Sequence, residues 1–592
     1  MDYQNYFIIF LFFHLLLYLR NCMSTSKTYI QVILPVRFRD TVTYSVPEEL
    51  VPEIRIGSRV DVMLGYRKYK GFVEEITHTP RYDTGKIKNI IGIDTEISAS
   101  PEDIRFWRTI SDYYMCSSGE ALKAASPFLM ELHTKREKSS GLKDSGSKSA
   151  HSEPKPVEKG TPGSKTAIFK PEFLKTGYTL ATKGEIFLKL IGEQRERGLE
   201  TLVLTPDIPS CRAMEKLLAP HLPEGLLTYH SGQTPAKKRG AVKQLLGMDT
   251  SPEGRPPHVI IGLRSALFLP FRNLGLIIVD DEHSPLYKQS EPTPRYHGRD
   301  LAIILAQISG ARIILASPTP SWETLHNISL HKYLPLPDPS GNYAGTPTNL
   351  QIIDFAKELR SGSTKGPLTN IALAALRSAV GEKVKCAILH PKWAFPLEEE
   401  LWRPEIEEAL GDTKVEIYTD IQTIESLKTP PSLVVVLQGE ALLSPKNFRS
   451  DERAIQQVER LLNITSHSKS AGRVILQTSL YRHNVFRFLA GKTDFESLLN
   501  ERSTANLPPF CRLIHIIVKD NVSERLEAKG DEIAVIIKRL GITDFDGPLP
   551  VSEDTLLFQL RLPRDKKTLK IKQCLSSALY HLENIIIDVD PY

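Results

Sequence analysis

The chain has 592 residues, of which 41% are hydrophobic, 24% charged and 8% aromatic. At roughly 100–200 residues per domain, this length indicates several domains. The composition is that of a globular chain, which argues against wholesale disorder, a coiled coil or a polytopic membrane protein. The 75 Lys and Arg residues exceed the 70 Asp and Glu residues by only five. Binding to nucleic acid would therefore depend on local patches rather than on the overall charge.

The six cysteines stand singly along the chain, without a C-x-x-C pair. This spacing predicts neither a structural zinc site nor a disulfide framework, so we expect reduced, buried or incidental thiols.

The N-terminus carries an apolar run, residues 7–19, interrupted only by His14. The run is shorter than the roughly 20 residues that span a bilayer. A basic cluster before it and a small-residue cleavage site after it, both typical of a signal peptide, are missing. We therefore predict that residues 1–26 are an extension outside the fold and that Met23 is the true start, with a membrane anchor or signal segment as the alternative.

Residues 29–77 alternate β-branched and polar residues between Pro and Gly positions, which predicts four or five short strands in a small barrel or sandwich. Residues 100–127 have helical spacing. Between residues 135 and 165, eight Lys or Arg stand against four Asp or Glu among Ser, Gly and Pro. We predict a domain over 27–130 and a basic, flexible linker over 131–170.

Two stretches alternate helical segments with apolar runs, which is typical of parallel sheets with crossover helices. The runs are TLVLTP, HVIIGL, LGLIIVD and ARIILAS in the first, and LQIIDF, KCAILH, LVVVLQ and RVILQT in the second. We predict α/β lobes over 171–345 and 346–480, followed by a small α/β domain over 481–592.

An acid cluster ends one of these runs, with Asp280, Asp281, Glu282 and His283 directly after an apolar strand. Motor ATPases place a metal-binding carboxylate at such a strand end. An ordinary acidic turn after a buried strand would show the same sequence pattern and is the alternative. The surrounding text GLRSALFLPFRNLGLIIVDDEHSPLYKQSEPTPRYHGRDLA resembles the signature of the primosomal protein N-prime (PriA) replication-restart helicase family of bacteria. Residues 29–127 and the segments NLPPFCRL and IDVDPY are also similar to that family.

The resemblance implies a multidomain α/β fold with a β-rich N-terminal DNA-binding domain, two RecA-like lobes of the superfamily 2 helicase type and a small C-terminal domain. It implies a cytoplasmic bacterial protein, ATP and Mg²⁺ as cofactors, and branched, forked or single-stranded DNA as partner. Replication-restart proteins and single-strand-binding protein are further partners it suggests, and no membrane is expected.

The phosphate loop departs from the family pattern. A working loop G-x-x-x-x-G-K-[ST] supplies glycines for close phosphate approach, a lysine for the phosphates and a hydroxyl for Mg²⁺. The matching stretch has Gly177 and Lys183 in place, but Thr182 replaces the second glycine and Gly184 replaces the hydroxyl. We predict weak nucleotide binding at most.

Three further departures concern the motor. Asp281 stands where the family has a Glu, which withdraws the carboxylate by one methylene. The arginine-finger segment Q-x-x-G-R-A-G-R is replaced by LNITSHSKSAGRVILQT, in which Gly472 and Arg473 are expected to belong to the next strand. Between residues 354 and 434, Cys386 is the only cysteine, so the family's zinc insertion has no counterpart and no zinc is expected. The altered phosphate loop, Asp281 and the missing arginine finger together predict a degenerate motor, with an active ATP-dependent 3′→5′ helicase as the alternative.

Two stretches combine basic and aromatic residues, as expected of surfaces that stack bases and meet phosphates. The first is an expected hairpin with Tyr66, Arg67, Lys68 and Lys70. The second follows the acid cluster, and its candidate DNA-binding residues are Tyr287, Lys288, Arg295, Tyr296 and Arg299. A solvated strand face and a polar loop with packed tyrosines are the respective alternatives.

Overall fold

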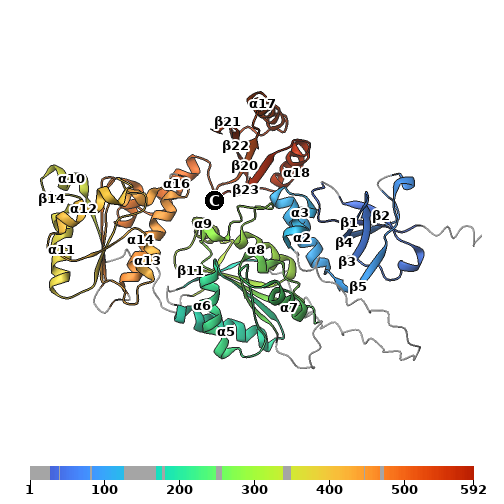
Figure 1. Cartoon of the computed structure of the whole chain (residues 1–592), viewed down its shortest axis with the longest axis horizontal. Helices are drawn as coiled ribbons and strands as arrows, with labels where there is room; N and C mark the ends of the chain where they lie inside the picture. The colour runs from blue at the N-terminus through green and yellow to red at the C-terminus, as the bar shows by residue number, and fades with distance from the viewer. Residues whose placement is uncertain are drawn as a thin grey trace, which may run out of the picture.

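The structure is a computed structural model that describes residues 27–38, 41–80, 83–125, 169–176, 180–247, 257–337, 349–445, 447–466, 468 and 472–592. The predictions made for residues 1–26 and for almost all of 131–170 lie outside these ranges. Four main sheets organise the described chain, and Figure 1 shows them as separate groups from the blue N-terminal part to the red C-terminal part. Among the described residues, no helix combines the length and apolarity needed to cross a bilayer.

The N-terminal sheet is antiparallel, with the order β2-β1-β4-β3-β5. Its strands are β1 (Tyr29–Ile33), β2 (Val42–Ser45), β3 (Ser58–Leu64), β4 (Arg67–Thr77) and β5 (Gly92–Ser98), with short helices η1 (Glu48–Leu50) and η2 (Thr84–Lys86) between them. Helices α2 (Pro101–Tyr114) and α3 (Ser118–Ala125) follow. Ser100 and Asp103 form a capping box that begins α2, and Trp107 packs edge-on against Phe72 of the sheet at 5.3 Å between ring centroids. The β-rich N-terminal part expected from the alternating pattern is confirmed.

The first lobe is a seven-stranded parallel sheet with the order β12-β6-β11-β10-β7-β9-β8. The strands are β6 (Glu172–Lys175), β7 (Glu200–Leu204), β8 (Leu226–Tyr229), β9 (Val259–Gly262), β10 (Leu274–Asp280), β11 (Arg312–Ser317) and β12 (Leu334–Pro335). The helices are α5 (Leu180–Glu196), α6 (Ile208–Leu218), α7 (Pro235–Leu245), α8 (Gly298–Ser309) and α9 (Trp322–Ser329), with short helices η3 (Ala219–His221), η4 (Arg264–Phe268) and η5 (Pro285–Tyr287). All four apolar runs predicted here are strands, because each is buried on both sheet faces.

The second lobe is a five-stranded parallel sheet with the order β13-β19-β18-β16-β17. The strands are β13 (Leu350–Asp354), β16 (Cys386–Leu389), β17 (Glu416–Tyr418), β18 (Leu433–Val436) and β19 (Arg473–Thr478), and β14 (Thr364–Lys365) pairs with β15 (Leu368–Thr369) beside them. The helices are α10 (Phe355–Arg360), α11 (Asn370–Gly381), α12 (Glu399–Leu410), α13 (Ile421–Glu425), α14 (Ser450–Ser466), α15 (Asn484–Leu489) and α16 (Phe495–Thr504), with η6 (Gly439–Leu443). The two parallel lobes confirm the expected multidomain α/β class.

The C-terminal part is an antiparallel sheet with the order β21-β22-β20-β23. It comprises β20 (Cys511–Lys519), β21 (Phe545–Ser552), β22 (Thr555–Pro563) and β23 (Ile585–Val589), with helices α17 (Ser523–Arg539) and α18 (Lys567–Leu579). One continuous hydrophobic cluster joins this sheet to α2, α3 and the first lobe. Two further clusters lie one on each face of the lobe 2 sheet, and Trp322 of α9 in lobe 1 belongs to the first of them. In Figure 1 lobe 2 forms a separate group to the left of lobe 1.

Candidate nucleotide and DNA-binding sites

Lys183 and the first two acids of the cluster meet at the carboxyl edge of the lobe 1 sheet. Lys183 lies in the first turn of α5, while Asp280 ends β10 and Asp281 follows it with a φ of 49°. The Lys183 ammonium donates to Asp280 Oδ1 at 2.9 Å and to Asp281 Oδ1 at 2.8 Å. Lys183 is only 6% exposed. Its three donors are therefore largely committed to carboxylates of its own lobe.

Burial and the neighbouring charges shift the pKa values of Lys183, Asp280 and Asp281. Burial alone would lower the pKa of Lys183, but the two carboxylates outweigh burial and raise it above its ordinary value. Burial, together with the charge of Asp281, raises the pKa of Asp280 to about 6. Burial also acts to raise the pKa of Asp281, but Lys183 and His283 outweigh it, so that pKa is lowered. A phosphate would have to displace these carboxylates before it could reach the lysine.

Gly184 of α5 lies against the side chain of Leu217 of α6. A Cβ placed on it would sit 2.1 Å from Leu217 Cδ2 and 2.9 Å from Leu217 Cγ. A serine or threonine here would therefore require Leu217 of α6 to move. Gly177 and the side chain of Thr182 lie outside the described residues. In this conformation Lys183 is therefore paired with carboxylates, and position 184 offers no hydroxyl to a metal ion.

Glu282 and His283, the other two members of the acid cluster, form hydrogen bonds with Ser321 and Ser317. Glu282 is fully buried and accepts from the Ser321 amide at 2.7 Å, from the Ser321 hydroxyl at 3.0 Å and from Arg299 Nη1 at 3.0 Å. His283 Nδ1 lies 2.7 Å from the Ser317 hydroxyl. Glu282 is thus a buried structural acid, whose lone pairs are used inside lobe 1.

Helix α14 presents a polar face to lobe 1. Gln456 donates to the carbonyl of Thr319 at 3.4 Å, and the charge of Arg460 lowers the pKa of Asp281. Arg460 itself forms an ion pair with Glu425. The stretch expected to lack an arginine finger is the continuation of α14 up to Ser466, and Arg473 opens β19 directly after Gly472. Sequence reasoning missed Arg460, although Arg453, Gln456 and Arg460 share one helical face by their spacing.

The stretch after the acid cluster lies inside the molecule, which corrects the expectation of an exposed DNA-contacting loop. Tyr287 and Tyr296 are 0% and 2% exposed. The Tyr287 hydroxyl donates to the carbonyls of Leu204 and Asp280, at 3.0 and 2.6 Å. Neither ring is available for stacking on a base in this conformation. Aromatic and basic residues also suit a buried contact between units, and that is where the fold places them.

The basic residues of the same stretch are engaged as well. Lys288 pairs with Asp588 Oδ1 at 2.7 Å and donates to the carbonyl of Val589 at 2.8 Å, so it anchors the C-terminal sheet. Arg299 pairs with Glu282 and with Asp300. Arg295 is partly buried and lies 3.5 Å from Glu291. These cations hold the fold together rather than face solvent.

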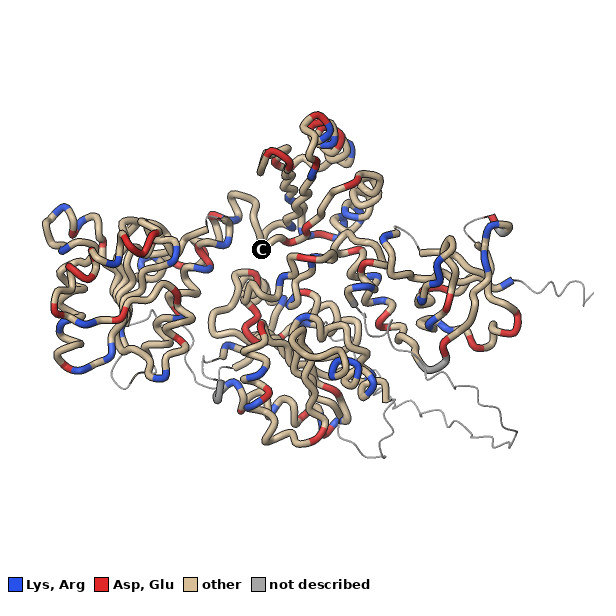
Figure 2. Tube along the Cα trace, in the orientation of Figure 1, with Lys and Arg blue, Asp and Glu red and all other residues tan. Residues whose placement is uncertain are grey.

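The N-terminal hairpin has the opposite environment. The turn at Gly65 and Tyr66 joins β3 to β4 with Leu64 opposite Arg67, and Tyr66, Arg67 and Lys68 are exposed. Lys68 pairs with Asp61 at 2.7 Å, and Lys70 lies 3.9 Å from both Asp61 and Asp94. Figure 2 shows positive and negative residues interspersed over every unit, so no whole unit has a surface of one sign. The exposed basic and aromatic residues of the hairpin are therefore a local feature of its turn.

Two polar side chains outside these stretches are buried. Tyr44 of β2 donates to the carbonyl of Met63 at 3.1 Å, and Gln31 of β1 accepts from Thr43 at 3.0 Å. Cys386 is buried in the lobe 2 sheet. Within the described ranges, no group of three or more His, Cys, Asp or Glu side chains is arranged to hold a metal ion.

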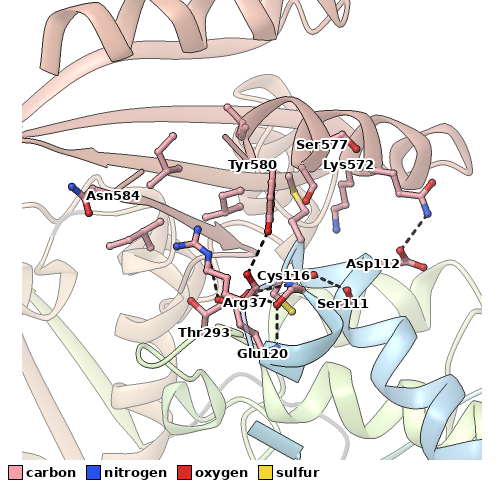
Figure 3. Close-up of a pocket in the computed structure, with 18 of the residues that line it drawn as sticks. Arg37, Ser111, Asp112, Cys116, Glu120, Thr293, Lys572, Ser577, Tyr580 and Asn584 are labelled. Carbon is pink, nitrogen blue, oxygen red and sulfur yellow. Dashed lines mark hydrogen bonds and ion pairs between the residues drawn. The ribbon is translucent and has the colours of Figure 1, made fainter. Parts of the chain in front are cut away.

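A cavity of about 590 Å³ lies between the N-terminal helices and the C-terminal sheet (Figure 3). Arg37 and Glu120 approach each other on one side of it, and Tyr580 donates to the carbonyl of Arg37. On the other side, Lys572 donates to the carbonyl of Tyr113 at 2.8 Å, and burial lowers its pKa to about 8. These contacts fix the N-terminal unit against the C-terminal one.

Comparison with known proteins finds one matching domain model and several related sequences. Residues 31–127 match the 3′DNA-binding domain (3′BD) of PriA. The chain is 30% identical over 361 residues to the replication restart protein PriA of Rickettsia conorii, covering 60% of this chain and 52% of that protein. It is 34% identical over 220 residues to PriA of a Synechocystis species, covering 36% and 24%. The chain thus spans about half the length, or less, of these curated relatives.

Solved structures are similar only remotely. RecG bound to a three-way DNA junction has a TM-score of 0.31 at 16% identity, with 56% of this chain and 44% of that chain covered. The helicase MrfA bound to DNA has a TM-score of 0.32 at 14% identity, with 56% and 49% covered. Residues 31–127 are thus similar to the 3′DNA-binding domain of PriA, and about 60% of the chain is similar to a replication restart protein PriA.

Proposed function

We propose that the chain binds branched, forked or 3′-ended DNA in replication restart, and that its ATPase motor is weak or inactive. The observation that carries the DNA-binding part is the exposed tip of Tyr66, Arg67 and Lys68, which lies within the region similar to the 3′DNA-binding domain. A ring and two cations on a projecting turn suit base stacking and phosphate contact. In this proposal residues 27–130 form the DNA-binding domain, 171–345 and 346–480 the two lobes, and 481–592 the C-terminal domain.

The test of the DNA-binding part is a triple variant in which Arg67, Lys68 and Lys70 become Ala. Each lost phosphate contact should flatten the slope of log affinity against log salt by about 0.9 for duplex DNA. Binding to forked DNA would be measured by fluorescence anisotropy over a salt series. The matched control changes three exposed cations of α17 to Ala, removing the same charge: Arg525, Lys538 and Arg539.

The expected result is weaker binding and a flatter slope for the hairpin variant, with the control close to the original protein. Equal losses in both variants would mean that only net charge matters. An unchanged affinity and slope in the hairpin variant would remove this surface from the proposal.

The weak motor is supported by three features of lobe 1 and α14. Lys183 donates hydrogen bonds to the carboxylates of Asp280 and Asp281. Gly184 has no hydroxyl that could bind Mg²⁺. Helix α14 continues where the family would carry its arginine finger. Phosphoryl transfer depends on cations and a placed carboxylate acting together, so these defects should compound. The alternative is an active 3′→5′ helicase, in which nucleotide displaces the carboxylates from Lys183.

Nucleotide binding and turnover separate these two possibilities. Calorimetry with ATP, with and without Mg²⁺, should give weak binding that Mg²⁺ improves little. Steady-state hydrolysis with forked DNA should be absent or very slow beside that of a full-length PriA protein. Turnover comparable to that control and abolished by Lys183→Ala would establish the active helicase instead.

The remaining partners and cofactors follow from the same proposal. We include ATP and Mg²⁺ as weak ligands, no zinc, and other replication-restart proteins and single-strand-binding protein as partners of the DNA-bound chain. Metal analysis of the purified protein tests the zinc part, because bound zinc would be retained through gel filtration.

A further inference from the structure

Tyr592 lies where the C-terminal part meets both lobes. It follows β23, and in Figure 1 the chain end marked C lies among the C-terminal sheet, α9 of lobe 1 and α16 of lobe 2. Its hydroxyl donates to the carbonyl of His283, the last member of the acid cluster, at 2.7 Å. Its ring packs on the His297 ring, at 5.3 Å between centroids and 30° between planes. One side chain of the C-terminal part is thus bound to lobe 1 at two points.

Two arginines of lobe 2 contact the same ring. Arg449 lies directly before α14 and Arg453 lies in its first turn, and their guanidinium carbons are 4.3 and 5.4 Å from the Tyr592 ring centroid. Cations this close to an aromatic ring are attracted by its electron-rich face, more strongly where water is excluded. Burial raises the pKa of Tyr592, so its hydroxyl stays a protonated donor near neutral pH. Tyr592 therefore joins the C-terminal part, lobe 1 and lobe 2.

The backbone that carries Tyr592 is anchored two residues earlier. Asp590 Oδ2 accepts from the Tyr113 hydroxyl at 2.7 Å and from Arg512 Nη1 at 2.9 Å. Arg512 belongs to β20 and Tyr113 to α2, so the segment is fixed both to its own sheet and to the N-terminal part. A side chain presented from an anchored segment loses little conformational freedom when it forms its contacts.

Direct contacts between the lobes lie beside Tyr592. Glu323 of α9 pairs with Arg449 at 2.6 Å, and the Trp322 amide donates to Glu452 of α14 at 2.9 Å. Arg449 and Glu452 are 5% and 1% exposed. Arg449 thus takes part both in an ion pair between the lobes and in the contact with the Tyr592 ring. The ring therefore reinforces the joint between the lobes.

The same side chain bears on the nucleotide site. His283 follows Asp280 and Asp281 in one turn, and these two carboxylates accept from Lys183. A hydrogen bond to the His283 carbonyl holds the end of that turn. When only a fraction of a protein is in the arrangement that accepts a ligand, the apparent affinity falls by that fraction. A contact that favours the closed arrangement therefore weakens nucleotide binding.

We propose that Tyr592 is an autoinhibitory latch, which holds lobe 2 and the acid cluster in the arrangement that keeps Lys183 paired with Asp280 and Asp281. Release of the ring lets lobe 2 move against lobe 1 and lets the acid-cluster turn relax, so that nucleotide reaches Lys183 more readily. The effect on nucleotide rests on the function proposed above for the Lys183 site, whereas the restraint on lobe 2 does not.

Hydrogen exchange of the full chain, read by mass spectrometry, measures the restraint. In Tyr592→Ala the amides of residues 317–324 and 449–456 should exchange about tenfold faster, because a hydrogen bond and two cation–ring contacts are lost. Tyr580→Ala is the matched control, since Tyr580 is another tyrosine of the C-terminal part and its hydroxyl donates to the carbonyl of Arg37. Equal exchange in the two variants would overturn the latch.

Two further variants keep the test decisive if Tyr592→Ala folds poorly. Tyr592→Phe keeps the ring and removes only the donor to His283, so it should speed exchange less than the alanine variant. Arg453→Gln removes one of the two cations from the lobe 2 side and should also speed exchange. Combined with Tyr592→Ala it should add little, because both changes act on one contact. Fully additive effects would place the two residues at separate sites and overturn the latch.

Calorimetry with ATP and Mg²⁺ separates the latch from the function proposed above. Tyr592→Ala should bind ATP up to about tenfold more tightly than the original protein, and Tyr580→Ala should bind it as the original does. Faster exchange without tighter binding would overturn the autoinhibitory role. Tight binding by the original protein would instead contradict the weak nucleotide site, and the exchange rates would still decide whether Tyr592 restrains lobe 2.

Discussion

The hairpin tip at residues 66–70 and the stretch at 287–299 have similar compositions and opposite environments. Both mix tyrosines with lysines and arginines, yet Tyr66 is fully exposed whereas Tyr287 and Tyr296 are buried. The hairpin is a tight turn at the end of β3 and β4, and no described residue of another unit covers Tyr66. The second stretch lies where lobe 1 meets the C-terminal sheet, and Lys288 reaches Asp588 across that contact. Composition alone therefore does not decide between a DNA-binding surface and a contact between units.

The largest expected difference between the two regions is in how much one basic side chain contributes to stability, and Arg299 is the residue that tests it. Changing Arg299 to Met removes the cation that pairs with fully buried Glu282 and leaves its charge uncompensated. Breaking a buried pair in this way costs about 3–5 kcal/mol of stability. We expect a much lower thermal midpoint, measured by calorimetry. Arg67→Met on the hairpin is the matched control, and it should leave the midpoint nearly unchanged because that side chain is exposed.

A smaller difference is expected in the response to acid. His297 is 2% exposed, and burial together with nearby Arg299 and Lys288 lowers its pKa to about 3, despite the opposing charge of Asp300. The unfolded chain therefore binds the proton more readily than the folded protein, so stability falls as the pH drops below about 6.5. At pH 5 this loss is about 2 kcal/mol.

His297→Phe should flatten this acid response, since it removes the group that titrates. The midpoint would be measured between pH 5 and 8 for the variant and for the original protein. His78 is the control position, because it lies in the N-terminal unit and is largely exposed. A steep acid loss that persists in His297→Phe would assign the response to other groups.

The third prediction concerns a single hydroxyl. Tyr287→Phe keeps the ring but removes the donor to the carbonyls of Leu204 and Asp280. Losing a buried hydrogen bond of this kind costs about 1–2 kcal/mol. Tyr66→Phe should cost nothing measurable in stability. If both variants melt alike, the hydroxyl of Tyr287 contributes less than its two short contacts suggest.

The parts that could be predicted from the sequence depend on local pattern. Runs such as LGLIIVD give strands because they are buried on both faces, and the alternation around Gly65 gives a hairpin. Short, half-exposed strands such as β8 and β17 carry no such signal and were not anticipated. The burial of Tyr287 and the pairing of Lys183 with Asp280 depend on residues about 80 to 100 positions away in the chain. Only the folded arrangement brings these partners together.

The smallest expected effect, and the sharpest for function, is on DNA binding. Tyr66→Ala should weaken binding to single-stranded or forked DNA by roughly fivefold to tenfold, because one exposed ring offers one stacking contact. The salt slope should stay unchanged, since no cation is lost. Tyr287→Phe serves as the comparison from the buried stretch and should leave DNA affinity unchanged in protein that remains folded at the assay temperature. Anisotropy titrations at two salt concentrations would measure both. If the buried tyrosine variant lost affinity and the exposed one did not, the stretch at 287–299 would have to open on DNA, and the roles of the two regions would be reversed.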